Sequence, residues 1–384
     1  MTSTAHTGRS PMRIMLVTTG LKVGGAEHQV ILLAQAFLAM GHAVAILSLS
    51  PGREIDLPPG AHVVELSMRK TPAGMMRALG QARTLVRTWR PDVIHAHMVH
   101  ANLFARALTR IVKCPPLVCT AHSFREGGRL RMAAYRLTDR WADITTHVSI
   151  DGRLGMIASG GVSASRIVVM PNGIDVERFR PDPAVRQATR TQLGFSADTR
   201  VLLNVGRLVP EKAQDTLIRA FAQVDPAIPA HLLIAGHGAL WQPLSDLVAS
   251  LGLASRLTLL GQCHDIPALL NAADAFALSS NVEGLPMVLV EALACGCSVV
   301  STDAPGVAEV VGDLGVVVPR GDVEGLAAAL TDTLRTGCGS PAVQASRRGR
   351  VLATFSIEAV ARRWLSLYVG LPGGGAIAPH SEAA

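Results

Sequence analysis

The sequence predicts an α/β protein built from two doubly wound domains. Its 384 residues are too many for one ordinary domain, and apolar residues make up 49% of the chain, which is enough for two cores. Short, β-rich apolar runs alternate with helical stretches, as in parallel sheets with right-handed crossover connections. The alternation restarts near the middle of the chain, so we expect two separate sheets.

The first series opens with the strand RIMLVTT, the Gly-rich loop GLKVGGAE, the helix HQVILLAQAFLAMG and the strand HAVAILSL. Further short apolar strands follow, separated by helical stretches: DVIHAH, PLVCTAHS, ITTHVSI and RIVVMPN. We place this N-terminal domain at residues 13–180, after a flexible tail at residues 1–12.

The second series opens with the strand RVLLNVG and a helix from Gln214, and continues with HLLIAG, LTLLG, AFALSS, SVVST and GVVVP. The join between the two series, PNGIDVERFRPDPAVR, is rich in turn formers. We place the C-terminal domain at residues 181–356. A last helix at 357–371 is expected to return towards the N-terminal domain, and residues 372–384 are expected to be disordered.

Composition excludes several protein classes. No run reaches the roughly 18 apolar residues of a membrane span, since Gln35 interrupts the richest segment. The apolar patch near the N-terminus is too short for a signal peptide. The six cysteines form no zinc-like CxxC pair, so we expect reduced, structural thiols. These features predict a cytoplasmic protein.

The charge is uneven along the chain. Residues 1–172 carry 20 Lys and Arg against 9 Asp and Glu, whereas residues 173–384 carry 16 against 20. The net charge of +7 therefore resides in the N-terminal half. A basic half can face nucleic acid, a membrane or an anionic substrate.

Ligands of open α/β sheets bind at the carboxyl ends of the strands. After the first strand, Gly24 and Gly25 open a helix whose N–H groups can face an anion. The spacing G-x3-G-G differs from the dinucleotide fingerprint, and the second strand ends without an acid for a ribose. In VGRLVPEKAQDT, Arg207 and Lys212 follow another strand, and Lys212 is the sole lysine of the C-terminal half. Two cations in one such loop suit a pyrophosphate leaving group.

The segment EGLPMVLVE carries two glutamates eight positions apart. Pro286 suits the first turn of a helix that runs to about Cys295, with Gly296 as its stop. Glu283 then lies in the loop, and Glu291 lies on the helix about two turns further on. A loop glutamate can hold sugar hydroxyls, and a helix glutamate can accept both ribose hydroxyls. Apolar neighbours surround Glu291, which argues against an ordinary surface charge.

The motifs GGAE, AHS, PNGID, GRLVPEK and EGLPMVLVEALACGCSVV occur in this order and spacing over residues 13–370. Together they resemble the GT-B glycosyltransferases, specifically the large retaining nucleotide-sugar family (family 4 type) that builds bacterial polysaccharides and glycolipids. The resemblance implies two Rossmann-like domains that face each other across a cleft, an N-terminal one for the acceptor and a C-terminal one for the donor.

The resemblance also implies roles for individual residues. Arg207 and Lys212 would neutralise the departing diphosphate together with the backbone of the Gly24–Gly25 turn, and Glu291 would bind the ribose. Glu283 would hold the donor sugar, and His122 would reach the sugar or the acceptor. The remaining expected donor-site residues are Leu285 and Asn172. The base would be held largely by backbone near residues 261–266.

The implied reaction is hexosyl transfer from a nucleotide-diphosphate sugar, with UDP as the expected nucleotide, to a saccharide or lipid-linked acceptor. Retention is usually drawn in this family as front-face attack with the diphosphate as base. No cofactor, metal or nucleic acid is expected. Two departures from the family pattern stand out: Ala213 follows Lys212 where a Gly is usual, and Pro305-Gly306 replaces a frequent Gly pair.

Other interpretations stay open. His95, His97 and His100 in HAHMVH suggest a metal, although His95 and His97 share one face of a strand and an oriented further ligand is usually needed. A doubly wound sheet also suits an NAD-dependent oxidoreductase. A sugar-nucleotide epimerase of the same fold and an inactive binding module are further alternatives.

Two basic clusters suggest the inner face of the plasma membrane. In the helix expected at 74–90, an apolar arc adjoins Arg83, Arg87 and Arg90. A second cluster follows His122: Arg125, Arg129, Arg131, Arg136 and Arg140. Such a surface suits an anionic bilayer and a lipid-linked acceptor. The alternative is that the apolar arc packs in the core and its arginines face solvent.

Overall fold

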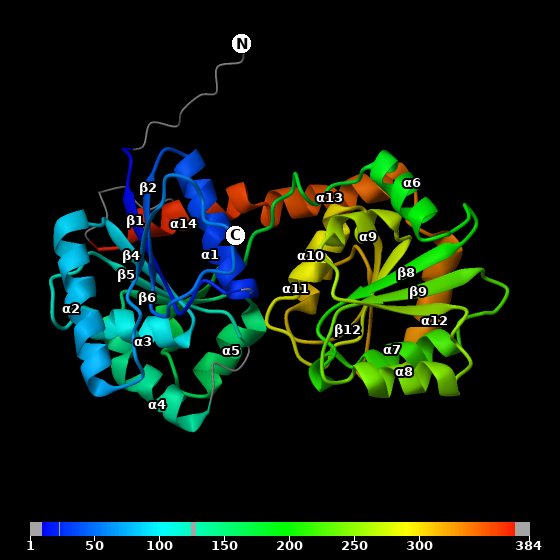
Figure 1. Cartoon of the computed structure of the whole chain (residues 1–384), viewed down its shortest axis with the longest axis horizontal. Coiled ribbons are helices and arrows are strands. Elements are labelled where there is room, and N and C mark those ends of the chain that lie inside the picture. The colour runs from blue at the N-terminus through cyan, green and yellow to red at the C-terminus, as the bar shows by residue number, and fades with distance from the viewer. Residues whose placement is uncertain (1–9, 23, 124–127, 373–384) are drawn as a thin grey trace, which may run out of the picture. The chain divides into compact units, whose positions relative to one another are not determined.

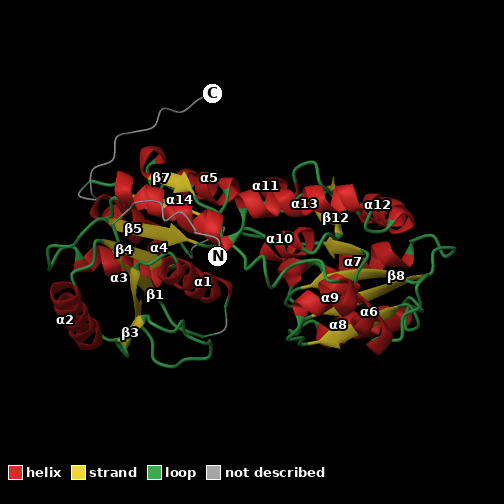
Figure 2. Ribbon diagram, turned by 90° about the horizontal axis from the view of Figure 1, so that it is seen from above, coloured by secondary structure: helices red, strands yellow, loops and turns green. Residues whose placement is uncertain are grey.

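The computed structural model describes residues 10–22, 24–123 and 128–372. The tails expected at 1–12 and 372–384 lie outside the described residues, apart from residues 10–12 and 372. The described chain forms two compact units, each with its own parallel sheet (Figures 1 and 2). The predicted fold class is therefore confirmed.

Each unit is built from segments that are not contiguous in the sequence. Unit 1 contains the residues up to Val148, Arg153–Gly173 and the residues from Val360 on. Unit 2 contains Ser149–Gly152 and Ile174–Ala359. Unit 2 thus begins earlier than the expected boundary at 180/181, because Ile174 forms a β-bridge with Ser356.

Unit 1 contains a seven-stranded sheet in the order β3-β2-β1-β4-β5-β6-β7, and its strands pair in parallel. The strands are β1 (Arg13–Thr18), β2 (Ala43–Ser48), β3 (His62–Glu65), β4 (Val93–His97), β5 (Leu117–Ala121), β6 (Ile144–His147) and β7 (Ile167–Val169). The helices are α1 (Gly25–Ala39), α2 (Pro72–Trp89), α3 (Val99–Leu108), α4 (Arg129–Thr138), α5 (Ile150–Ala158) and the C-terminal α14 (Ile357–Gly370), with 3₁₀ turns η1 (Asp139–Trp141) and η2 (Ala164–Arg166).

Unit 2 contains a six-stranded sheet in the order β10-β9-β8-β11-β12-β13, again parallel. The strands are β8 (Arg200–Val205), β9 (Ala230–Ala235), β10 (Leu257–Gly261), β11 (Ala275–Leu278), β12 (Ser298–Thr302) and β13 (Val316–Val318). The helices are α6 (Pro183–Gln192), α7 (Gln214–Ala222), α8 (Trp241–Ser250), α9 (Ile266–Ala272), α10 (Met287–Ala294), α11 (Val307–Val311), α12 (Val323–Thr336) and α13 (Pro341–Thr354), with the 3₁₀ turn η3 (Pro210–Lys212).

All the strands expected from the two series are present, and the sequence pattern missed one. The missed strand, β3, has four residues and lies at the sheet edge, and its side chains are half-buried or exposed. Its apolar pattern is therefore weak. Four residues are also too few for an alternating pattern to stand out.

Each side of the unit 1 sheet has its own covering. On β4, Ile94 and Ala96 pack into a core with α2 and α3. His95 and His97 alternate with them and point to the other side, where the His95 ring lies 4.3 Å from that of Trp364 on α14. This is the shared face expected of the two histidines. Period-two alternation therefore places two polar rings opposite an apolar core.

One core cluster of unit 2 lies between its sheet and three helices, α7, α8 and α12. Leu217, Phe221 and Leu330 are among its fully buried side chains. The Leu202, Leu232 and Ile234 side chains of β8 and β9 meet them from the sheet. This packing fixes the carboxyl ends of β8, β9 and β11, from which the expected donor-site loops leave.

Candidate functional site

Lys212 and Glu283 form an ion pair at the carboxyl end of the unit 2 sheet. Lys212 ends η3 after β8, and Glu283 lies in the loop after β11, the neighbouring strand. Lys212 Nζ lies 2.5 Å from Glu283 Oε1, and the Glu283 side chain is 9% exposed. Ser280 Oγ donates to the same carboxylate oxygen at 2.6 Å. The structure therefore brings together Lys212, which was expected to bind the diphosphate of the donor, and Glu283, which was expected to hold its sugar.

Hydrogen bonds join the two loops behind this ion pair. Ser279 Oγ donates to the Lys212 carbonyl at 3.0 Å, and Asn281 N donates to the Glu211 carbonyl at 2.8 Å. Thr302 Oγ1, at the end of β12, donates to the Ser280 carbonyl at 2.6 Å. Three neighbouring strand ends therefore hold the Lys212–Glu283 pair in place.

Arg207 lies in the same β8 loop as Lys212 and is exposed. Its carbonyl accepts a hydrogen bond from the Gln214 side chain at 3.0 Å, so its backbone is fixed to the start of α7. The guanidinium remains at the surface of this loop. Arg207 and Lys212 thus place two cationic side chains at one strand end, as the sequence predicted.

Ala213 adopts a left-handed conformation, with φ 47° and ψ 44°, at the start of α7. This is the position at which the related family usually has Gly. A Cβ in this conformation costs roughly 1–2 kcal/mol. The departure seen in the sequence therefore falls at a place where glycine would relieve strain.

In unit 2, two pairs of loops approach each other closely through their backbones. A Cβ added to Gly236 would overlap the Gly206 carbonyl, and one added to Gly306 would lie 2.6 Å from the Gly284 carbonyl oxygen. Gly306 also has φ 78°, which favours glycine. Of the Pro305-Gly306 pair, the second position therefore keeps the residue that its backbone requires.

Glu291 lies on α10, whose N-cap is Pro286 and whose C-cap is Cys295, with Gly296 left-handed beyond it. These are the helix bounds that the sequence predicted. Burial raises the pKa of the Glu291 carboxyl to about 7, and the charge of Arg178 lowers it in part. Leu285, just before the helix, is buried. Glu291 therefore changes its charge near neutral pH.

In unit 1, the expected anion-binding turn opens α1. Gly24 is the N-cap with an extended backbone and no side-chain cap, and a Cβ on Gly25 would meet nothing within 4 Å. A Cβ on Gly24, in contrast, would meet the Glu27 carboxylate in the first turn of the helix. Asn172 is partly buried, and the following Gly173 N donates to Gln29 Oε1 on α1 at 3.1 Å. That bond fixes the Asn172 segment to the same helix.

Histidines gather at the carboxyl ends of β4, β5 and β6. His97 Nδ1 lies 3.0 Å from His122 Nε2, and the His95 and His97 ring centroids are 3.9 Å apart. His147, at the end of β6, bonds through Nε2 to the Ser123 carbonyl at 3.1 Å. Burial lowers the pKa of His95 and His97 far below the usual value and that of His122 to about 3. These three rings are neutral at physiological pH.

His100 does not join this cluster. It lies on α3, where it is exposed, and burial with the nearby Arg131 and Lys70 charges lowers its pKa. Over residues 10–22, 24–123 and 128–372, no three His, Cys, Asp or Glu side chains are grouped as metal ligands.

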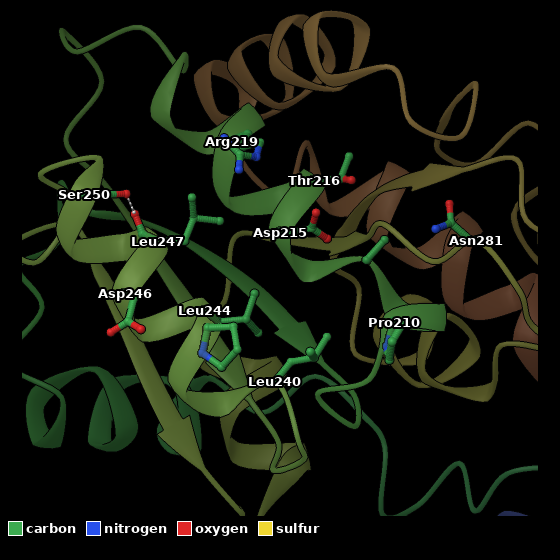
Figure 3. Close-up of a pocket in the computed structure, with 12 residues that line it drawn as sticks. Pro210, Asp215, Thr216, Arg219, Leu240, Leu244, Asp246, Leu247, Ser250 and Asn281 are labelled. Carbon is green, nitrogen blue, oxygen red and sulfur yellow. Dashed lines mark hydrogen bonds between the residues drawn. The ribbon is translucent and has the colours of Figure 1, made fainter.

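A cavity of about 720 Å³ lies beside the donor-site loops of unit 2 (Figure 3). It lies between α7 and α8, and its lining includes Leu244 and Leu247 of α8 as well as Asp215 and Asp246. Pro210 and Asn281 line it, whereas Lys212 and Glu283 do not. The cavity therefore lies next to the ion pair without containing it.

Sequence reasoning missed several residues that shape the site. Arg178 acts on the Glu291 charge, and Arg348 donates to the Ala294 carbonyl at the end of α10. Ser279 and Ser280 end the strand segment AFALSS, and the sequence pattern assigns them no role. Their place directly after an apolar run was the available sign, since polar residues at carboxyl ends of strands are candidates for function.

Among the helices of the described residues, none is long and apolar enough to cross a bilayer.

Comparisons with known proteins agree with the fold. Residues 185–350 match the family model described as glycosyl transferases group 1, and residues 23–178 match that of glycosyltransferase family 4. A D-inositol 3-phosphate glycosyltransferase of Geodermatophilus obscurus is 30% identical over 359 residues, covering 81% of this chain and 78% of that protein.

A second curated relative is the GDP-mannose-dependent monoacylated alpha-(1-6)-phosphatidylinositol monomannoside mannosyltransferase of Corynebacterium glutamicum. It is 36% identical over 215 residues, which cover 53% of this chain and 56% of the relative. The match thus spans little more than half of that protein. Among solved structures, Anabaena HepE in complex with UDP superposes with a TM-score of 0.81 at 22% identity, over 94% of this chain and 100% of that one. At that identity the likeness concerns the fold.

Proposed function

Since this chain belongs to the family 4-type GT-B glycosyltransferases, we propose that it transfers a hexosyl group from a nucleotide-diphosphate sugar to a saccharide or lipid-linked saccharide. We further propose that the anomeric configuration is retained. The observation that carries the proposal is the Lys212–Glu283 ion pair with Arg207 on the same loop. Two cations beside a carboxylate at adjacent strand ends suit a diphosphate joined to a sugar.

The roles follow from charge and position. As the anomeric carbon–oxygen bond breaks, negative charge develops on the diphosphate, and Arg207 and Lys212 stabilise it. Glu283 holds Lys212 in the resting site and accepts hydrogen bonds from donor-sugar hydroxyls. Glu291 accepts the two ribose hydroxyls, and the Gly25 backbone N–H binds a phosphate oxygen.

The donor base is a separate question. The sequence favours UDP, whereas the name of the Corynebacterium glutamicum relative includes GDP-mannose. We therefore place GDP-mannose first and UDP-hexoses second. A thermal-shift panel of GDP-, UDP- and ADP-sugars separates them, because a ligand that binds the folded state alone raises the melting temperature.

The activity itself is tested by following radiolabelled donor with and without acceptor. Transfer requires an acceptor, whereas the alternative, a sugar-nucleotide epimerase, converts its donor alone. Proton NMR of the first product then gives its anomeric configuration. Conversion without acceptor, or an inverted product, would reject the proposal. No turnover with any donor that binds would favour the inactive binding module.

The lipid-linked acceptor raises the question of membrane contact. In α2 the apolar side chains Ala78, Leu79, Ala82 and Val86 are buried in the unit 1 core. The arc is therefore used by the fold and cannot also enter lipid. The adjoining Arg83, Arg87 and Arg90 are exposed, so we propose a purely electrostatic contact with an anionic bilayer surface.

Liposome sedimentation tests this contact. Each arginine near an anionic surface contributes about 1 kcal/mol, so an Arg83/Arg87/Arg90→Glu variant should sediment far less than the wild type. Binding should require anionic lipid and weaken with salt.

The control changes three exposed arginines of unit 2, Arg180, Arg219 and Arg320, to Glu. It has the same net charge as the α2 variant. Equal loss of binding in both variants would reject α2 as the contact. Arg125 and the Arg129 side chain, part of the second expected cluster, lie outside what the structure describes.

A further inference from the structure

Two leucines of α4 face solvent. Leu130 is 89% exposed and Leu137 is 72% exposed, the highest values of any large apolar side chain in the part of the chain that the structure describes. They are seven positions apart, about two turns, and therefore lie on one line along the helix. Ala133, on the same side between them, is exposed as well. The helix α4 thus presents an apolar stripe to solvent.

The opposite side of α4 is fixed to the fold. The helix lies beside α3 in unit 1 (Figure 1). The Tyr135 side chain is fully buried, and its hydroxyl accepts a hydrogen bond from Asn102 Nδ2 at 2.7 Å. The Tyr135 carbonyl accepts from Arg106 Nη1 at 3.1 Å, and Met132 packs in the same apolar cluster as Tyr135. Because this side is anchored in the core, the outward direction of the two leucines is set by the fold.

Arginines border the apolar stripe on both sides. At about 100° per residue, Arg131 lies about 100° from Leu130 in one direction around the helix and Arg136 about 120° in the other. Arg140 follows in the turn η1. All three arginines are exposed, and none has an ion pair within residues 10–22, 24–123 and 128–372. Their positive charges are therefore available to a partner.

The surroundings of α4 contain little negative charge. The helix itself, RLRMAAYRLT, has no Asp or Glu. Asp139, which follows it, is buried and pairs with two arginines. Burial lowers the pKa of His100 on α3, and so do the nearby charges of Arg131 and Lys70. Basic side chains from before α2 and from α4 therefore lie near the same residue of α3.

An apolar stripe with arginines on both flanks is the arrangement of a helix that lies in the surface of a bilayer. The apolar side chains enter the boundary of the acyl chains, and the guanidinium groups stay at the level of the lipid phosphates. The helix α2 has the reverse arrangement, because its apolar arc is buried in the core. Positive charge on both flanks of α4 suits a surface dense in anions.

We propose that α4 docks on an anionic phospholipid surface, with its two exposed leucines inserted below the headgroups and its flanking arginines paired with lipid phosphates. This contact adds apolar insertion to the charge-only contact proposed for α2. Docking needs neither donor nor acceptor, so it is measured whether or not the proposed sugar transfer occurs.

Vesicle binding of the full-length protein tests the leucines. With vesicles of phosphatidylcholine and phosphatidylglycerol, Leu130/Leu137→Ser should bind about 10- to 100-fold more weakly than the wild type, because burial of an exposed leucine strengthens binding by about three- to tenfold or more. Its binding should keep the wild-type dependence on salt, since the number of arginines is unchanged. Arg131/Arg136/Arg140→Gln, in contrast, should reduce the salt dependence.

The matched control changes two exposed apolar side chains of α13 in unit 2, Val343 and Leu352, to Ser. This variant should bind vesicles as the wild type does. Unchanged binding in Leu130/Leu137→Ser, or an equal loss in the control, would overturn the proposal. All four side chains are exposed, so both variants should keep a melting temperature close to that of the wild type.

Insertion is measured with a tryptophan in the stripe. In Leu137→Trp, vesicles whose acyl chains carry bromine should quench fluorescence beyond the level seen for the native tryptophans. Leu352→Trp should show no added quenching. The absence of added quenching in Leu137→Trp would overturn the proposal.

A second copy of the chain is the alternative occupant of the stripe. Sedimentation velocity without lipid should give the same sedimentation coefficient for the wild type and Leu130/Leu137→Ser. A wild-type dimer that dissociates in this variant, while vesicle binding stays unchanged, would identify an interface between copies and reject the lipid contact.

Discussion

Because the Glu291 carboxyl titrates near neutral pH, we expect nucleotide-sugar binding to depend on pH in that range. Its carboxyl has a pKa of about 7, raised by burial. Ribose hydroxyls donate hydrogen bonds, so they bind the carboxylate and disfavour the protonated acid. Binding should therefore strengthen as the pH rises through 7 and should release a proton.

The magnitude follows from the titration. With a pKa of about 7, about one tenth of the Glu291 carboxyls are ionised at pH 6 and about nine tenths at pH 8. The dissociation constant should fall about tenfold between these pH values, or about 1.4 kcal/mol. Isothermal titration calorimetry at pH 6, 7 and 8 measures it. A nucleotide-diphosphate sugar is the suitable ligand, because both of its phosphates are esterified and keep their charge over this range.

The change Glu291→Gln gives the matched control. It should bind more weakly than the wild type at pH 8 and show a flat pH profile. The pH dependence of folding stability has the opposite sign to that of binding. An acid whose pKa is higher in the folded state destabilises the fold as the pH rises from about 4.5 through 7, so Glu291→Gln should raise the melting temperature at pH 8.

Glu309 is a second control, because burial also raises its pKa while its Oε1 accepts from Ile150 N at 2.6 Å. Glu309→Gln should leave the pH profile of binding in place. A wild-type profile that is flat between pH 6 and 8, or one that is lost in Glu309→Gln and kept in Glu291→Gln, would refute the assignment of the ribose to Glu291.

Three further predictions concern the β8 loop and its partner. Arg207→Ala and Lys212→Ala should each lower turnover by about 10²-fold or more with little change in unfolding temperature, since each removes a charge that stabilises the leaving group; near-normal kcat in either variant would remove that role. Glu283→Gln should reduce transfer more than nucleotide affinity, and its combination with Lys212→Ala should cost less than the two single losses together, because the side chains are 2.5 Å apart; additive losses would contradict the coupling. Ala213→Gly should stabilise the fold by up to about 1 kcal/mol in urea unfolding, since it relieves a left-handed backbone, whereas Ala220→Gly in the interior of α7 should destabilise it by about 1 kcal/mol; destabilisation by both changes would argue against strain at Ala213.

Much of the fold could be predicted from the residues that begin and end helices and from the spacing of apolar residues along the chain. The helix from Pro286 to Cys295 followed from a proline at its start and a glycine at its end, and α10 has these caps. The same reasoning placed Glu283 in a loop and Glu291 on the helix. The same reasoning did not predict the edge strand β3, because its partly buried residues lack a clear alternation of apolar and polar side chains.

The sequence pattern could not predict which residues from different strand ends are in contact. Lys212 and Glu283 are 71 positions apart, and they meet because β11 lies next to β8 instead of following β10 in the sheet. A sequence shows that both residues end strands, but it does not show which strand ends are neighbours. The same is true of the Glu291 pKa, which depends on how deeply the fold buries the carboxyl.

The hydrogen bond from α14 to the first sheet has a consequence for biosynthesis. Tyr368, which bonds to His95, emerges from the ribosome after the whole of Ile174–Ala359. That stretch takes roughly 10 to 40 s to translate at about 5–20 residues per second. Throughout this interval the nascent N-terminal sheet lacks the ring that closes over its histidines. Unit 1 is therefore completed last although its first strand is made first.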